Sequence, residues 1–315
     1  MSPAASRSPR PAFSALASVG DLAWWKPLVA SAASVTAMLV ASIPLVVVAH
    51  GSESVRQRGI DVAGFTPEVA GVAPWAFLVW ILLPFAVALA VLAATVRMTE
   101  GRSWRTLVSA ARPRPRWGRA WAAGGVWFAL AGASDLVTAS LTDAAYAYRG
   151  VEGGLLPVAV VALVLVPAQV AFEEVSMRGY LHQVVSHYTG RPVWGIAVSS
   201  VVFAALHFGN PEVAHYGLAA MAGYYLGFAL LLAAVSVLDG GLELALGIHL
   251  STNLYAILCV SVEGSALPMP ALWSLSSPSA AQLLLTSATK AALFTAFFAR
   301  FSDWRLATLT RRVSP

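Results

Sequence analysis

Eight stretches of this sequence are long and apolar enough to cross a lipid bilayer. A membrane-spanning helix needs about 20 consecutive, mostly apolar residues. The pattern therefore predicts an all-α, polytopic membrane protein with about eight transmembrane helices. The predicted spans are Pro27 to His50, Pro74 to Val96, Arg119 to Leu141, Leu156 to Tyr180, Val193 to Phe208, His215 to Leu238, Leu242 to Val262 and Ala280 to Arg300.

The composition agrees with a membrane protein and argues against other classes. Hydrophobic residues make up 58% of the chain and charged residues 11%, whereas about a quarter of the residues in soluble domains are charged. The mean hydropathy is +0.72. These values argue against a soluble globular protein, a disordered chain and a nucleic-acid-binding module. A single cysteine, Cys259, excludes an intramolecular disulfide bond and a cysteine-rich zinc site.

Lys and Arg are distributed unevenly between the predicted loops. If the N-terminus is cytoplasmic, fifteen of them fall in cytoplasmic segments and three on the other side. Because cytoplasmic loops carry the excess of Lys and Arg, both termini are predicted to be cytoplasmic. The run from Arg112 to Arg116 lies in such a loop, so we interpret it as a topology signal and expect no nucleic-acid partner. The composition is typical of bacteria, which predicts a multi-pass protein of the plasma (inner) membrane.

The two ends of the chain differ from the spans between them. Residues 1–26 begin with a stretch rich in Ser, Pro and Ala, without an apolar core, and are predicted to be a disordered cytoplasmic tail. Residues 27–300 are predicted to form the transmembrane helical domain. Residues 301–315 are predicted to be a basic cytoplasmic tail.

An acidic pair and an arginine lie at the end of the fourth span. An ionised side chain at the bilayer centre costs about 2.5–3.5 kcal/mol, so polar groups in spans are functional candidates. Glu174 and Arg178 are four residues apart and should be neighbours on one helix face. Glu173 points about 100° away from Glu174. One carboxylate can thus be neutralised by the arginine while the other meets a different environment, which is how a site obtains a reactive carboxylate.

Two further polar groups lie in later spans. His207 ends the apolar run of the fifth span, and His249 and Asn253 are four residues apart in the seventh. Glu173 and His207 are equally distant in sequence from the turn at Gly190. In an antiparallel helical hairpin this places them at the same depth, on the cytoplasmic side of the membrane. His182 and His187 are interpreted as surface residues, and Asp135 as a hydrogen-bonding partner of a neighbouring helix.

These residues, in this order, resemble the three motifs of the CPBP intramembrane protease family, which includes the CAAX prenyl proteases and the bacterial Abi-type proteins. The motifs are Glu173-Glu174-xxx-Arg178, Phe203-xxx-His207 and His249-xxx-Asn253. The resemblance extends over residues 155–262, which we take as the catalytic core. It implies an eight-helix membrane fold with a polar cavity open to the cytoplasm, and hydrolysis of a peptide bond in a membrane-associated peptide or protein.

The resemblance also implies roles for the residues. Glu173 matches a general base that activates water, with Glu174 and Arg178 as its supporting pair. His207 matches a histidine that helps to hold the water or the transition state, and His249 and Asn253 match groups that stabilise the oxyanion. A divalent metal, zinc, bound by Glu173, His207, His249 and Asn253 would also activate water. A metal-free mechanism is equally consistent with these residues, because the chain has no HExxH motif.

Other functions remain open from the sequence. A non-catalytic protein of the same fold would serve as a membrane scaffold or as an immunity protein against a peptide toxin. Buried Glu, Arg and His also relay protons in ion or small-molecule transporters. The catalytic groups are intact and the chain shows no inverted repeat, so we expect the endopeptidase.

Overall fold

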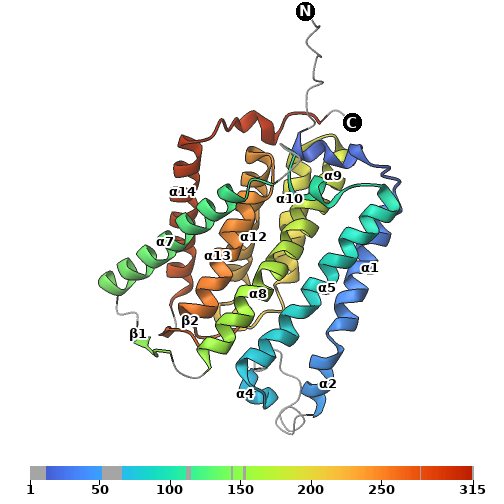
Figure 1. Cartoon of the computed structure of the whole chain (residues 1–315). Coiled ribbons are helices and arrows are strands. Elements are labelled where there is room, and N and C mark those ends of the chain that lie inside the picture. The colour runs from blue at the N-terminus through green and yellow to red at the C-terminus, as the bar shows by residue number, and fades with distance from the viewer. Residues whose placement is uncertain are drawn as a thin grey trace, which may run out of the picture.

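The computed structural model describes residues 12–51, 66–110, 115–142, 145–151, 154–276 and 278–313. Their helices run roughly side by side as a bundle, with one small sheet at one end (Figure 1). The helices are α1 (Lys26–Ala41), α2 (Ile43–Gly51), α4 (Pro67–Ala70), α5 (Pro74–Glu100), α6 (Trp104–Val108), α7 (Trp117–Leu141), α8 (Leu155–Glu174), α9 (His182–Thr189), α10 (Pro192–Leu206), α11 (Pro211–Tyr216), α12 (Leu218–Asp239), α13 (Glu243–Leu258) and α14 (Ala280–Arg300).

Six helical segments of the described chain are long and apolar enough to cross a membrane. They are Lys26–Ala49, Pro74–Glu100, Trp117–Leu141, Leu155–Thr189, Leu218–Asp239 and Ala280–Arg300. The protein is therefore a polytopic membrane protein. The prediction of eight spanning helices differs at α10 and α13, which have 15 and 16 residues. Polar residues and turns shorten both: α10 ends just before His207, and α13 begins at a buried acid, Glu243.

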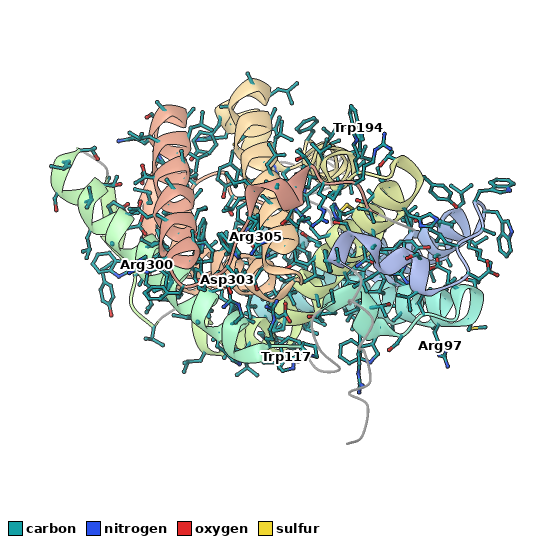
Figure 2. The ribbon with its side chains drawn as sticks, turned by 90° about the horizontal axis from the view of Figure 1, so that it is seen from above. Arg97, Trp117, Trp194, Arg300, Asp303 and Arg305 are labelled. Atoms are coloured by element: carbon teal, nitrogen blue, oxygen red, sulfur yellow. The ribbon has the colours of Figure 1, made fainter. Side chains whose placement is uncertain are left out.

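One end of the bundle collects positive charge. Lys26 begins α1, Arg116 precedes α7, Arg191 precedes α10 and Arg300 ends α14. All lie at the end of the bundle where the first and the last described residues of the chain lie (Figure 1). From above, Arg97, Arg300 and Arg305 are spread around this face (Figure 2). We call it the basic end.

A three-stranded sheet lies at the opposite end of the bundle, so the prediction of an all-α fold is wrong in this detail. β1 (Ala145–Tyr148) pairs antiparallel with β3 (Trp273–Ser276), and β3 pairs parallel with β2 (Val260–Val262). Tyr148 stands opposite Trp273 in register, with the ring centroids 5.0 Å apart. The sheet thus connects the chain after α7 to the chain after α13.

Residues next to the termini pack against the basic end instead of forming free tails. The 3₁₀ helix η1 (Phe13–Val19) buries Phe13 and Leu16. The 3₁₀ helix η4 (Leu306–Leu309) places Leu309 against the α10–α12 contact. The structure therefore differs from the predicted disordered tail over residues 12–26, and the rest of that prediction, residues 1–11, lies outside the described residues.

His182 is buried, so its interpretation as a surface residue is wrong. It is 1% exposed, its Nε2 lies 2.9 Å from Ser14 Oγ, and its ring stacks on Phe13. The N-terminal segment that was expected to be disordered supplies both partners. His187, by contrast, is partly exposed.

Asp135 is the hydrogen-bonding partner of a neighbouring helix, as predicted. Tyr255 of α13 donates to Asp135 Oδ2 at 2.6 Å, and Tyr146 of β1 donates to Oδ1 at 3.1 Å. Closer to the basic end, α13 packs tightly on α7, because a Cβ on Gly247 would overlap the carbonyl oxygen of Ala120. These contacts fix α13, which carries His249 and Asn253, against α7.

Candidate active site

The acidic pair lies where α8 changes into a π-helix. α8 ends at Glu174, and the segment Val175–Leu181 (η3) continues with π-type bonding: the N–H of His182 bonds to the carbonyl oxygen of Met177. Such π-segments are rare and occur often at functional sites. A Cβ on Gly179 would overlap the carbonyl oxygen of Leu107. Glycine therefore lets α6 approach η3 closely.

The predicted ion pair between Glu174 and Arg178 is present and fully buried. Arg178 Nη1 donates to Glu174 Oε1 at 3.1 Å, and neither residue has measurable exposure. Arg178 also donates to the carbonyl oxygen of Ala229 at 3.3 Å, and its guanidinium lies 4.4 Å from the centre of the Phe203 ring. A buried charge is costly unless it is paired, so this pair holds α8, η3, α10 and α12 together.

His249 joins the two carboxylates from α13. Its Nδ1 lies 2.8 Å from Glu174 Oε1, and its Nε2 lies 3.6 Å from Glu173 Oε2. An ionised carboxylate only accepts hydrogen bonds, so Glu174 fixes the proton on Nδ1 and orients the ring. The Nε2 of His249 is thereby directed toward Glu173.

One oxygen of each carboxylate, Glu173 Oε2 and Glu174 Oε2, has no hydrogen bond within the described chain, but only Glu173 turns that oxygen toward His249 Nε2. The side chain of Glu173 is 13% exposed. Because 3.6 Å is well below twice a hydrogen-bond length, one water molecule can contact both Glu173 Oε2 and His249 Nε2. The separation of these two atoms therefore permits a bridging water molecule.

Asn253 is connected to Glu173 by a residue that was not predicted. Gln169, one turn before Glu173 on α8, donates from Nε2 to Glu173 Oε1 and accepts from Asn253 Nδ2 at 2.9 Å. The four-residue spacing between Gln169 and Glu173 indicates that the two side chains are neighbours on one helix face. Its link to Asn253 depends on how α8 and α13 pack.

His207 lies beside this cluster and not in it. Its Nδ1 lies 2.7 Å from the carbonyl oxygen of Phe203, and its ring contacts those of Phe203 and Tyr225 at centroid distances of 4.3 and 4.9 Å. Phe203, one turn earlier, reaches His249 at 6.0 Å. Within the described chain, His207 has no hydrogen bond to Glu173 or His249. A proton on Nδ1 leaves His207 Nε2 free to accept.

The donors do not form a preassembled metal site in this conformation. Among the described residues, no group of three or more His, Cys, Asp or Glu side chains is arranged to hold a metal ion. The bonds of His249 and His207 use their Nδ1 atoms, and that of Asn253 uses its Nδ2. Zinc bound by Glu173, His207, His249 and Asn253 therefore stays a prediction.

The site lies a short distance inside the basic end of the bundle. Tyr180 donates to Glu100, the last residue of α5, so Tyr180 is level with that helix end. The helix from Glu173 to Tyr180 rises about 10 Å at 1.5 Å per residue. On α13, the rise from Glu243 to His249 is about 9 Å. Measured along either helix, the site therefore lies about 10 Å from the basic end.

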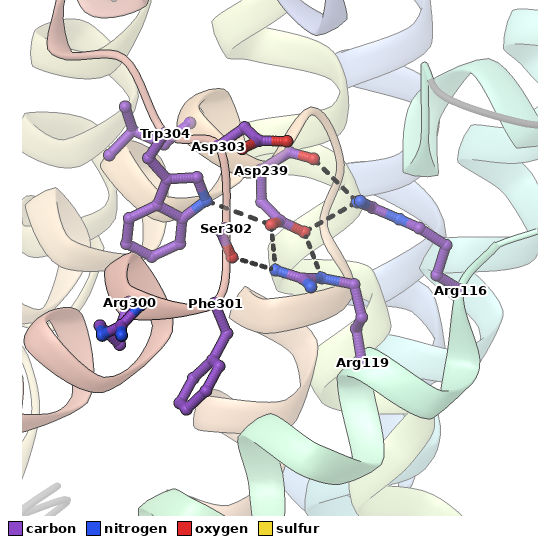
Figure 3. A pocket seen from close by; sticks show the side chains of 9 residues that line it. Arg116, Arg119, Asp239, Arg300, Phe301, Ser302, Asp303 and Trp304 are labelled. Carbon is purple, nitrogen blue, oxygen red and sulfur yellow. Dashed lines mark hydrogen bonds and ion pairs between the residues drawn. The ribbon is translucent and has the colours of Figure 1, made fainter.

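A second group of charges lies at the basic end itself. Arg116 and Arg119 both form ion pairs with Asp239, at the end of α12 (Figure 3). Arg116 also pairs with Glu243, at the start of α13. Trp304 Nε1 also donates to Asp239 at 3.2 Å. We call Arg116, Arg119, Asp239, Glu243 and Trp304 the terminal cluster. Burial opposes the charge of Arg116, but its bonds to Glu243 and Asp239 outweigh that effect and raise its pKa.

Two cavities lie outside the site. A cavity of about 390 Å³ adjoins the terminal cluster and is lined by Arg119, Arg300 and Trp304 among others (Figure 3). One of about 290 Å³ lies beyond His207 and is lined by Asn210, Phe77 and Ile81 among others. None of the predicted site residues lines either cavity. The predicted polar cavity open to the cytoplasm, around those residues, stays a prediction.

The fold and the site together define a polytopic membrane protein with a buried carboxylate–histidine cluster between its helices. Residues 152–255 match the family model described as type II CAAX prenyl endopeptidase, Rce1-like. The chain carries a domain of this Rce1-like type II CAAX prenyl endopeptidase (CPBP/Abi) family. All six predicted site residues and Gln169 lie within the matched range.

The chain also resembles a curated bacterial protein. It is 32% identical over 105 residues to the uncharacterized protein YyaK of Bacillus subtilis (strain 168). The similarity covers 33% of this chain and 34% of that protein, so the chain spans about a third of the length of the relative it matches. No solved structure matches the chain.

Proposed function

We propose that this protein is an intramembrane endopeptidase that hydrolyses a peptide bond with a water molecule activated by Glu173. The observation that carries this proposal is Glu173 Oε2, which makes no hydrogen bond within the described chain and lies 3.6 Å from His249 Nε2, beside a fully buried Glu174 that is paired with Arg178. Membership of the domain in an endopeptidase family supports the same reaction class.

In the proposed reaction, Glu173 Oε2 accepts a proton from the water as the water oxygen attacks the scissile carbonyl carbon. A C–O bond forms, and the carbonyl π electrons move onto the carbonyl oxygen. The tetrahedral intermediate then collapses and the C–N bond breaks. The proton held by Glu173 passes to the leaving nitrogen.

The remaining residues have distinct proposed tasks. Glu174 and Arg178 hold His249 in one orientation. His249 in its imidazolium form, which donates from Nδ1 to Glu174 and keeps a second N–H on Nε2, and the second N–H of Asn253 stabilise the oxyanion, for which one preorganised donor contributes about 3–4 kcal/mol. His207, with Nε2 free, helps to hold the water or the transition state. Zinc analysis of the purified protein and cleavage in the presence of a chelator decide whether zinc also takes part.

The position of the site suggests how a substrate arrives. By the excess of Lys and Arg, the basic end is cytoplasmic, with both termini on that side of a plasma (inner) membrane. The site then lies about 10 Å inside the protein from that surface. We propose as substrate a membrane-associated peptide or protein whose cleavage site reaches this depth.

The test compares protein termini in membranes from cells that carry the wild type or Glu173→Gln at equal expression. Mass spectrometry of terminal peptides should find new termini with the wild type alone. The variant should lower their formation by about 10²- to 10⁴-fold, the usual contribution of a general base. Equal termini in both samples would refute hydrolysis by Glu173 and favour a scaffold, an immunity protein or a transporter.

A further inference from the structure

We propose that Gln169 is a positioning residue that sets both the base and the oxyanion donor of this site. Within the described chain, Gln169 is the only residue that forms hydrogen bonds with both Glu173 and Asn253. Its side chain belongs to α8, and the residue is 7% exposed. The amide therefore cannot exchange these partners for solvent without a change in helix packing.

The direction of this link follows from the chemistry of its ends. An ionised Glu173 only accepts hydrogen bonds, so the NH₂ group of Gln169 must face it. The carbonyl oxygen of Gln169 then faces Asn253 and accepts from Nδ2 at 2.9 Å. A flipped Gln169 amide would place its oxygen against the carboxylate. The charge of Glu173 thus fixes which way two successive amides point.

This direction has two consequences for the reaction. The bond from Gln169 occupies Glu173 Oε1, so Oε2, which faces His249, is left as the proton acceptor. The bond to Asn253 holds its NH₂ group on the side of Glu173, and the second N–H of Nδ2 remains available to an oxyanion. One glutamine therefore aligns the proton acceptor with the oxyanion donor.

The inference rests on the proposed function, and its test uses a synthetic peptide that spans a cleavage site found by the terminal-peptide comparison. Gln169→Met removes both hydrogen bonds but keeps an unbranched side chain. We expect kcat to fall by about 100-fold, the cost of a small misplacement, with KM changed by less than about threefold. An unchanged kcat would overturn the inference while leaving the proposed function intact.

A matched control is present on the same continuous helix. Gln183 is fully buried, accepts from Arg102 and donates to the carbonyl oxygen of Thr106 at 3.0 Å, outside the site. Gln183→Met should lower thermal stability in detergent at least as much as Gln169→Met, with kcat unchanged. An equal fall in kcat for both variants would assign the effect of Gln169 to stability alone and overturn the inference.

A double variant tests the link to Asn253. If Gln169 acts partly through Asn253, then Gln169→Met should cost much less in an Asn253→Ala background than in the wild type. If Gln169→Met lowers kcat by the same factor in both backgrounds, Gln169 does not act through Asn253, and this part of the inference is overturned. If the wild type itself produces no termini beyond those of Glu173→Gln, the proposed function fails, and the role of Gln169 fails with it.

Discussion

The candidate site and the terminal cluster are both built from carboxylates and arginines, but they satisfy their carboxylates differently. In the terminal cluster every oxygen of Asp239 and Glu243 has a partner. In the site, Glu174 Oε1 accepts from both Arg178 and His249, whereas Glu174 Oε2 and Glu173 Oε2 have no hydrogen bond within the described chain, and Glu173 Oε2 faces His249 Nε2. A saturated cluster can only hold helices together. A carboxylate with a free oxygen beside a histidine can exchange a proton.

Neutralising one carboxylate in each cluster should separate these roles most clearly. Glu173→Gln should reduce hydrolysis by about 10²- to 10⁴-fold and keep the unfolding temperature within about 2 °C. Asp239→Asn should show the reverse, with stability lowered by about 2 kcal/mol and an unchanged rate per folded molecule. Both are checked by terminal-peptide formation and by thermal unfolding in detergent. A rate loss in Asp239→Asn that exceeds its loss of folded protein would contradict the division.

Arg178→Met should produce the next largest effect, on stability. It leaves the fully buried Glu174 with only His249 as a partner, and breaking a buried pair costs about 3–5 kcal/mol. Little folded protein is expected in membranes, measured by detergent extraction and size-exclusion chromatography. The double variant Glu174→Gln/Arg178→Met is the control, because it removes the unpaired charge. It should recover folded protein but not cleavage, and a double variant as unstable as the single one would contradict this explanation.

Gly247→Ala examines the helix that joins the two clusters. Gly247 lies on α13 between Glu243 and His249, and an added Cβ overlaps the Ala120 carbonyl on α7. Such overpacking costs about 1–3 kcal/mol, measured by thermal unfolding. Gly125→Ala, where a Cβ meets no atom within 4 Å, is the matched control on α7. Similar unfolding temperatures for the two variants would show that α7 and α13 have room to separate.

Trp304→Phe should have the smallest effect. It removes the Nε1–H bond to Asp239 at 3.2 Å and keeps the aromatic ring. Asp239 retains Arg116 and Arg119, so the expected loss is about 1 kcal/mol. Thermal unfolding of Trp304→Phe in the wild-type and Asp239→Asn backgrounds measures the coupling. Additive losses would mean that this hydrogen bond contributes nothing to the terminal cluster.

The sequence predicted features that depend on local spacing. The apolar runs indicated the long helices, and the four-residue spacing of Glu174 and Arg178 indicated their ion pair. Asp135 was expected to bond a neighbouring helix because an isolated acid in a span needs a partner. Each of these follows from the geometry of a single helix.

Features that depend on packing between distant segments could not be predicted in the same way. The strand containing Tyr148 is only four residues long, and its partner strand begins at Trp273. His182 is buried because η1 covers it, and nothing near His182 in the sequence indicates that cover. The sequence shows that Gln169 and Glu173 are four residues apart. The bond from Asn253 to Gln169, however, depends on how α8 packs on α13, which the sequence does not show.

The π-helix has a consequence for insertions and deletions. An α-helix turns by about 100° per residue, and the wider π turn accommodates one additional residue. The number of residues between Glu174 and His182 therefore matters as much as their identity. Deleting one of them, with every polar side chain of the site retained, would allow an ordinary α-helix to form and would leave α9 in nearly the same orientation relative to α8. Inserting one further residue would instead rotate α9 by about 100° relative to α8, so that His182 turns away from Ser14 and the cover that η1 provides is lost.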